Sequence, residues 1–167
     1  MIQTYSPQKG FTIVELLIVI VVIGILAAIT IVAFNGVQNR ANDSVVRQDL
    51  ASISKSLAMS HTLQGTYPVS AAELADPDRE LVIKPSRSAY LLTSNNFIYC
   101  YGSGTNYALI GKSKSGTTYY VNNTNTTTPT EFTYPFPASQ VDVCPQAGAG
   151  GAGAWGFAGP GWSSWVQ

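Results

Sequence analysis

The chain has 167 residues, of which only 11% are charged, and its nine basic residues balance nine acidic ones. An ordinary soluble domain carries about 25% charged residues, and aromatic residues interleaved with Lys/Arg clusters are missing, so a nucleic-acid-binding surface is not indicated. With one histidine and two cysteines, the sequence offers no convincing zinc set and no Ser–His–Asp or Cys–His arrangement. We therefore expect no enzyme, no metal site and no cofactor.

The first predicted element is a long apolar segment headed by a single carboxylate. Glu15 is the only charged residue from Phe11 to Asn39, and the 19 residues from Leu16 to Phe34 carry no charge. At 1.5 Å per residue, a helix of this length spans roughly 28 Å, the thickness of a bilayer core. A carboxylate at the edge of a membrane helix is costly unless a partner neutralises it, so Glu15 is a candidate functional residue.

A cleaved secretory signal is the competing interpretation of this segment. Ala27 and Ala28 imitate a cleavage site. However, Lys9 is the only basic residue before the apolar run, and the run is longer than the apolar region of such signals.

The segment from Asp43 to Gln64 continues the helix with a different pattern. Apolar residues recur at steps of four, three and four, which is one stripe at the 3.6-residue period: Val46, Leu50, Ile53 and Leu57. Gly65 occupies a C-terminal cap position, and Pro68 blocks further extension. The sequence therefore predicts one helix of roughly 50 residues, apolar all round in its first half and amphipathic in its second, where it should pack on a folded head.

The residues at the start of this helix resemble a known family. Gly10-Phe11-Thr12-Ile13-Val14-Glu15, with the apolar run to Ile29, is similar to the class III signal of type IV pilins and the related pseudopilins. The resemblance implies cleavage by a prepilin peptidase between Gly10 and Phe11, N-methylation of Phe11, and a role for Glu15 in assembly, where its carboxylate meets the N-terminal ammonium of a neighbouring subunit. Two charges that are each costly in an apolar filament core become tolerable when they are paired.

The sequence differs from many pilins at one point and shares a second, shorter motif with some of them. Many pilins carry a helix-breaking proline in the second half of the apolar segment, whereas the stretch from Gly24 to Phe34 has none, which puts partial melting of the helix on assembly in doubt. Gly65-Thr66-Tyr67-Pro68 resembles a Gly-x-Tyr-Pro motif at the end of the long helix in pilins and pseudopilins of Gram-positive type.

Beyond Pro68 the pattern predicts a short helical turn at 71–75 and then strands. Four runs rich in Tyr, Leu, Ile and Val are separated by Gly-containing turns, which is typical of an antiparallel meander: 90–93, 97–101, 107–110 and 117–121. One face of this sheet should cover the amphipathic half of the helix. The expected fold is therefore α+β, a long N-terminal helix packed on a small antiparallel sheet.

Cys100 and Cys144 are the two cysteines of the chain. If this part lies outside the cytoplasm, a disulfide between them is the natural interpretation, and two unrelated buried thiols are the alternative. A disulfide would close a loop of about 45 residues and stabilise the fold by roughly 4 kcal/mol on the chain-entropy model.

The tail from Ala147 to Gln167 is rich in Gly and Ala and carries three tryptophans. It is expected either to be a flexible end or to dock its aromatic residues on the head or on a neighbouring subunit. The predicted organisation is a leader (1–10), an apolar helix (11–34), an amphipathic helix (35–65), a head (66–146) and this tail (147–167).

Three functions follow from these features and the resemblance. The first is a structural subunit of a type IV pilus, made as a single-pass precursor in the inner (cytoplasmic) membrane and then polymerised through its N-terminal helix into an extracellular filament. Its expected partners are further copies of the chain, a prepilin peptidase and an inner-membrane assembly platform. The second is a minor pseudopilin of a type II secretion or competence system, and the third is a single-span membrane protein whose head binds a ligand without polymerising.

Overall fold

The structure is a computed structural model that describes residues 10–92, 95–125, 128–136, 139–158 and 161–167. The chain divides into two compact units, Met1–Gln38 and Asn39–Gln167. The expected leader lies outside the described residues apart from Gly10. Helix α1 (Ile13–Gln64) begins in the first unit and ends in the second.

In the first unit, α1 is the described element, and the apolar side chains from Phe11 to Phe34 are exposed along it. Within the described residues, α1 is the one helix long and apolar enough to cross a membrane. The helix is continuous through Gly24 and Gly36, although glycine has a low helix propensity and these are two positions at which a bend would cost little free energy.

In the second unit, α1 buries the stripe that the sequence predicts. Val46, Leu50, Ile53 and Leu57 are all at most 2% exposed. The helix ends at Gln64, and Gly65 follows with φ 77° and donates its N–H to the His61 carbonyl at 2.8 Å. A positive φ at this position terminates the helix and is most easily adopted by glycine.

The head contains a six-stranded antiparallel sheet with strand order β4-β3-β2-β1-β5-β6. Its strands are β1 (Phe97–Tyr101), β2 (Tyr107–Lys112), β3 (Thr118–Asn122), β4 (Thr130–Glu131), β5 (Ala152–Ala158) and β6 (Gly161–Trp162). The first three match predicted runs to within two residues at either end. The α+β fold class is confirmed.

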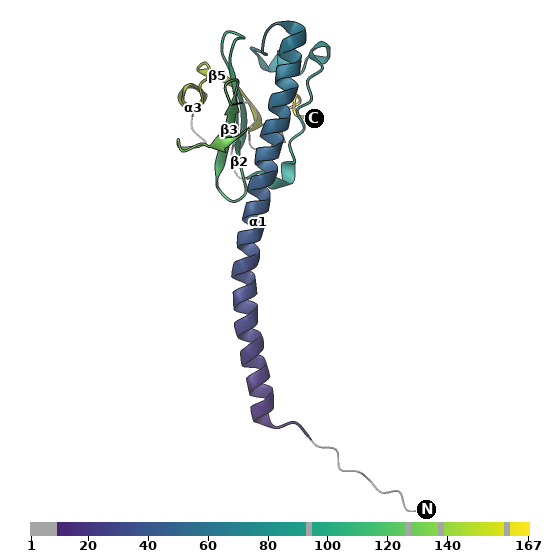
Figure 1. Cartoon of the computed structure of the whole chain (residues 1–167), viewed down its shortest axis with the longest axis vertical. Helices are drawn as coiled ribbons and strands as arrows, with labels where there is room; N and C mark the ends of the chain where they lie inside the picture. The colour runs from purple at the N-terminus through teal and green to yellow at the C-terminus, as the bar shows by residue number, and fades with distance from the viewer. Residues whose placement is uncertain (1–9, 93–94, 126–127, 137–138, 159–160) are drawn as a thin grey trace, which may run out of the picture. The chain divides into compact units, whose positions relative to one another are not determined.

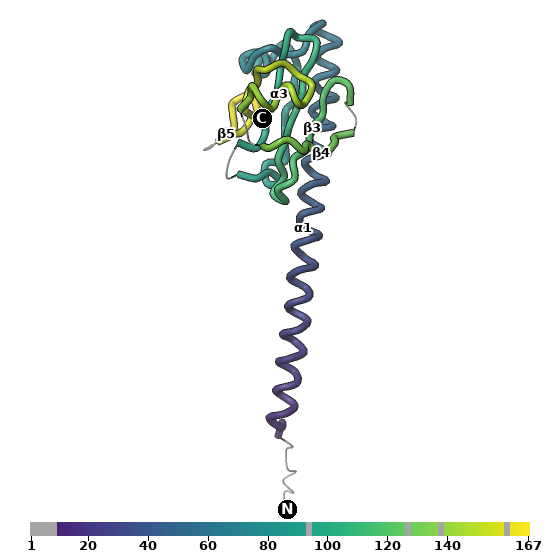
Figure 2. Tube along the Cα trace, turned by 90° about the vertical axis from the view of Figure 1, so that its left-hand side faces the viewer, coloured from purple at the N-terminus to yellow at the C-terminus, as the bar shows by residue number. Residues whose placement is uncertain are grey.

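The two faces of the sheet bury two separate apolar clusters. The stripe of α1 packs with Tyr99, Leu109 and Val121 on one face, and Ile98, Ile110 and the two cysteines lie in the cluster on the other face. Because neighbouring residues of a strand point to opposite faces, this alternation follows directly from the sequence of β1 and β2. The second half of α1, the sheet and α3 (Gln140–Gln146) are therefore three successive layers (Figures 1 and 2).

The predicted strand at 90–93 is wrong for its described residues. The chain forms α2 (Ala71–Leu74) and two short 3-10 helices, η1 (Pro77–Arg79) and η2 (Arg87–Ala89), and Tyr90 then makes an isolated bridge with Ser113. Strand β2 is already paired with β1 on one side and β3 on the other. A further strand therefore has no free edge beside β2 to extend, and the pairing stops after one bridge.

Of the two expectations for the tail, the flexible end is wrong and docking on the head is confirmed, because residues 152–158 form β5 inside the sheet and Trp165 and Val166 are buried in the core of the head. Two glycines of β5, Gly153 and Gly156, serve close packing. A Cβ atom at Gly156 would lie 2.3 Å from Cδ1 of Phe97, and one at Gly153 would lie 3.1 Å from the Cys144 sulfur. At these two positions the strand has no room for a side chain.

Candidate functional site

The start of α1 is organised by two side chains three positions apart, Thr12 and Glu15. Phe11 is 91% exposed and precedes the helix, as does Gly10. Thr12 occupies the N-cap position before Ile13, and Glu15 is the third helical residue. Thr12 donates its backbone N–H and its hydroxyl to Oε2 of Glu15, each at 2.8 Å, and Oγ1 of Thr12 accepts the Glu15 N–H at 3.2 Å.

This reciprocal pattern is a capping box, in which two backbone donors without partners in the helix are satisfied by two side chains. It gives Glu15 a local role that does not involve a second molecule. Both hydrogen bonds to the carboxylate end on Oε2, and Oε1 accepts none within the described residues. The carboxylate therefore stabilises its own helix with one oxygen and leaves the other at the surface.

Thr12 is the residue that sequence reasoning missed at this site. The signal was available, because Thr12-Ile13-Val14-Glu15 matches the S/T-x-x-E pattern immediately before an apolar run.

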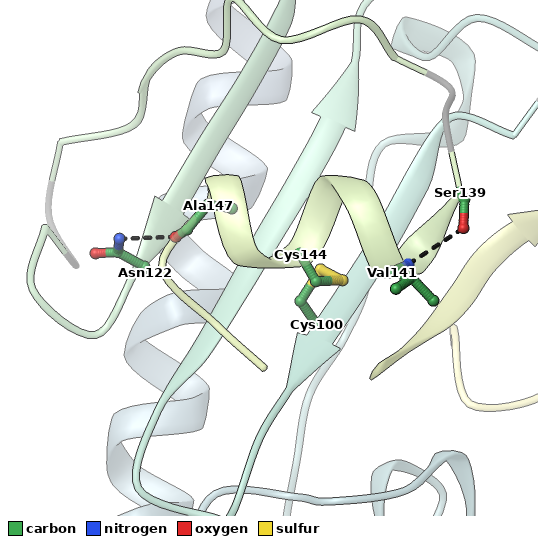
Figure 3. The surroundings of a disulfide bond; sticks show 6 residues. All are labelled: Cys100, Asn122, Ser139, Val141, Cys144 and Ala147. Carbon is green, nitrogen blue, oxygen red and sulfur yellow. Dashed lines mark hydrogen bonds between the residues drawn. A yellow bond between two sulfur atoms is a disulfide. The ribbon is translucent and has the colours of Figure 1, made fainter. Parts of the chain in front are cut away.

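The second predicted group, Cys100 and Cys144, is brought together by the head. Cys100 lies in β1 and Cys144 in α3, and their sulfur atoms are bonded at 2.00 Å with the Cα atoms 5.4 Å apart (Figure 3). Both residues are fully buried. The disulfide interpretation is confirmed, and the alternative of two unrelated thiols is excluded.

Helix α3, which carries Cys144, was not predicted from the sequence. Ser139 caps it by accepting the Val141 N–H at 3.3 Å, and at its other end Asn122 donates Nδ2–H to the Ala147 carbonyl at 2.9 Å (Figure 3). A seven-residue helix has too little length for a periodic signal, and Pro145 near its end argues against a helix. The cap, the disulfide and the asparagine hold it in place instead.

The Gly-x-Tyr-Pro motif joins the end of α1 to the sheet. Tyr67 donates its N–H to the Gly104 carbonyl at 2.9 Å, and its ring packs on Tyr107 with a centroid distance of 4.6 Å. Pro68 accepts the Tyr99 hydroxyl at 3.0 Å. The motif therefore positions the end of α1 through backbone bonds and aromatic packing.

Tyr107 also contacts α1 directly, because its hydroxyl lies 2.7 Å from the hydroxyl of Ser54 in a buried hydrogen bond. Burial in this apolar cluster is the main reason that the pKa of Tyr107 is raised to about 12. Burial likewise raises the pKa of Tyr99. These phenols stay neutral at physiological pH and are structural groups.

The fold and these two groups define a class of protein: an N-terminal apolar helix with a capped carboxylate at its start, followed by a disulfide-bonded α+β head. Comparison with known proteins specifies the class. The prokaryotic N-terminal methylation motif matches residues 5–31, which include Gly10, Phe11 and Glu15.

Relatives extend the likeness beyond this motif. The type IV wide pilus major component PilA4 of Thermus thermophilus is 30% identical over 141 residues, which cover 82% of this chain and 97% of the relative. The type IV major alpha-pilin of Moraxella bovis is 33% identical over 90 residues, covering 54% of this chain and 56% of that protein. The type II secretion system core protein G of Klebsiella michiganensis is 32% identical over 81 residues, covering 48% and 54%.

The chain thus spans about half the length of the Moraxella and Klebsiella relatives that it matches, and nearly all of the Thermus protein. It belongs to the type IV pilin family.

Proposed function

We propose that this chain is a structural subunit of a type IV pilus that polymerises through the first half of α1 into a cell-surface filament. The observation that carries the proposal is the apolar surface between Leu16 and Phe34, which is exposed along its length and preceded by Glu15. An apolar surface of this extent needs a bilayer or further protein around it. The names of the Thermus and Moraxella relatives, both pilus components, support the filament.

The apolar surface of α1 suits two successive environments, first the cytoplasmic membrane and then the filament core. The precursor is a single-pass protein of the cytoplasmic membrane with its leader, residues 1–10, on the cytoplasmic side. A prepilin peptidase cuts between Gly10 and Phe11, Phe11 is N-methylated, and an inner-membrane platform transfers the subunit into the filament. The chain has no catalytic role in this scheme and needs no cofactor.

Glu15 sets the register between subunits in this proposal. Cleavage after Gly10 creates an ammonium group on Phe11, and the free Oε1 of Glu15 is the oxygen that accepts the ammonium of a neighbour while Oε2 remains bonded to Thr12. A charge pair in an apolar core is strongly penalised when either partner is missing. Subunits that enter out of register leave both charges unpaired.

Mass spectrometry of the N-terminal peptide from protein sheared off the cell surface tests the processing. We expect a peptide that begins at methylated Phe11. A peptide that begins at Met1, or after Ala28, would overturn the pilin chemistry and favour the membrane-anchored or secreted alternatives.

Two variants separate the charge of Glu15 from its capping role. Glu15→Gln keeps an acceptor for the capping box but removes the charge, whereas Thr12→Ala removes the cap and keeps the charge. We expect Glu15→Gln, and likewise Glu15→Ala, to leave the chain stable in the membrane but to reduce sheared filaments at least about tenfold. Thr12→Ala should assemble far better than either. Equal filament yields from Glu15→Gln and the unaltered chain would rule out the register role.

A minor pseudopilin is the second candidate, favoured by the likeness to the Klebsiella secretion protein. Abundance distinguishes the two: a major pilin makes up the bulk of sheared filaments, and a minor pseudopilin is a trace component. The third candidate is a membrane protein whose head binds a ligand without polymerising. It would reach the cell surface even in cells that lack the prepilin peptidase.

A further inference from the structure

The apolar run of α1 is followed by two exposed carboxamides. Asn35 comes directly after Phe34, and Asn39 lies four positions later. We propose that Asn35 of one copy hydrogen-bonds Asn39 of a neighbouring copy in the filament, so that the two amides fix the register after the apolar run as Glu15 does before it. This inference rests on the proposed function, because it requires α1 helices of different copies to pack side by side.

The polar side chains of this stretch differ in whether their own helix satisfies them. Thr30 donates its hydroxyl to the Ala27 carbonyl at 2.9 Å, so its polar group already has a partner. Within the described part of the chain, the side chains of Asn35 and Asn39 make no hydrogen bond. Water and lipid headgroups can hydrate these amides in the precursor, whereas an amide buried between packed helices costs free energy unless another group bonds to it.

Asn35 lies where helix packing would bury it. Together with Thr30, Ile31 and Phe34 it lines a hollow of about 360 Å³ on the surface of α1. These residues form two neighbouring rows at a spacing of four positions, 30–34 and 31–35, and the hollow is the groove between the rows. A row of side chains from another helix packs into such a groove. A neighbouring helix that fills the hollow therefore also covers the amide of Asn35.

The spacing of the amides matches the register that Glu15 sets. When the Phe11 ammonium of one copy meets Glu15 of its neighbour, the two chains are offset by four positions, about 6 Å along the helix. The same offset brings Asn35 of the first copy level with Asn39 of the neighbour. Asn39 lies 24 positions after Glu15, close to the roughly 24.5 residues in seven turns at the 3.5-residue period, so both fall on one stripe of a helix packed beside another.

Gly36 permits the close approach that two short amide side chains need. It lies 21 positions after Glu15, which is six turns of the same stripe. A Cβ added to Gly36 would meet nothing within 4 Å, so the packing of its own chain does not require glycine there, whereas small residues at a helix interface let two backbones come closer. A carboxamide both donates and accepts hydrogen bonds, so one asparagine can satisfy another and thereby specify the register between two helices.

Cysteine cross-linking in filaments tests the contact directly. The two native cysteines are bonded to each other and buried, so the introduced thiols are the ones available for oxidation. Cells that co-express Asn35→Cys and Asn39→Cys chains should yield sheared filaments containing a disulfide-linked dimer of the two, identified by mass spectrometry of the joined peptides. Asn35→Cys with Ser44→Cys is the matched control and should give far less dimer, because Ser44 is exposed but lies five positions beyond Asn39, about 7.5 Å along the helix and on another face.

Apolar substitutions test the hydrogen bond itself. Asn35→Leu and Asn39→Leu each leave the other amide buried without a partner, so each should lower the amount of chain in sheared filaments at least about fivefold at equal membrane levels. The double variant Asn35→Leu/Asn39→Leu leaves no unpaired amide and should recover most of that loss. Thr30→Val alters the same hollow but removes a hydroxyl that bonds within its own helix, and it should change the yield less than about twofold.

Three outcomes would overturn the inference: no cross-link between the 35 and 39 variants beyond that of the control, single leucine variants that assemble like the unaltered chain, or a double variant whose loss equals the product of the two single losses. The unaltered chain separates this inference from the pilus proposal. If it forms no filaments, the pilus proposal fails and this inference fails with it. If it forms filaments in which any of the three outcomes is found, only this inference fails.

Discussion

Removing the disulfide by the double substitution Cys100→Ala/Cys144→Ala should destabilise the head by a predictable amount. The two cysteines are separated by 44 positions, so the closed loop contains about 45 residues. The chain-entropy relation then gives about 13 cal/mol/K of lost unfolded-state entropy, or about 4 kcal/mol at 25 °C.

This free energy converts into a shift of the melting temperature. The unit Asn39–Gln167 contains about 130 residues, and unfolding entropies near 2.1 cal/mol/K per residue give it about 0.27 kcal/mol/K. The expected decrease in Tm is therefore about 15 °C, measured by circular dichroism of the full chain in detergent micelles.

The control is the unaltered chain, unfolded and refolded in a reductant so that both thiols are free. Its Tm should fall almost as far, because it loses the same loop constraint. Any further decrease in the double-alanine variant measures the void left by two fully buried sulfur atoms. A decrease below about 4 °C in both samples would refute the loop-entropy reasoning and indicate that α3 is held mainly by its packing and its bond to Asn122.

Three further predictions concern the head. Leu50→Ala should lower the free energy of unfolding, measured in urea, by about 3 kcal/mol because Leu50 is fully buried. The control Met59→Ala, at a side chain 71% exposed, should change it by less than about 0.5 kcal/mol, and equal effects would contradict the packing of the stripe. Gly65→Ala should lower the free energy of unfolding by about 1 kcal/mol in the same assay. The cost is conformational alone, because φ is 77° and an added Cβ would meet no atom within 4 Å. An unchanged stability would show that alanine adopts this conformation without strain. The free energy of unfolding should fall as pH rises above about 10, because the phenol of Tyr107 ionises near pKa 10 in the unfolded state whereas the folded state raises its pKa to about 12. The stabilisation by the neutral phenol is complete below pH 10, and about 1.4 kcal/mol of it is lost by pH 11. Tyr107→Phe should reduce the fall between pH 9 and 11 by that amount, and an unaltered fall would exclude Tyr107 as its source.

The sequence by itself determined the elements whose signals are local. The uncharged run after Glu15 is long enough to be a helix of bilayer length, the stripe from Val46 to Leu57 has the helical period, and Gly65 is the residue that a positive φ favours. Strands β1, β2 and β3 were predictable because β-branched and aromatic residues lie between Gly-containing turns. The capping box was equally local, and the Thr-x-x-Glu pattern would have identified Thr12.

Only the tertiary structure decided what depends on residues far apart in the chain. Residues 90–92 have the composition of a strand, but both sides of β2 were already paired, so they formed no strand. The Gly-rich tail looks flexible in isolation, yet Gly153 and Gly156 are what allow β5 to lie against Cys144 and Phe97. A flexible chain and a closely packed strand can share the same composition, because glycine permits both, and the neighbours supplied by the rest of the fold decide between them.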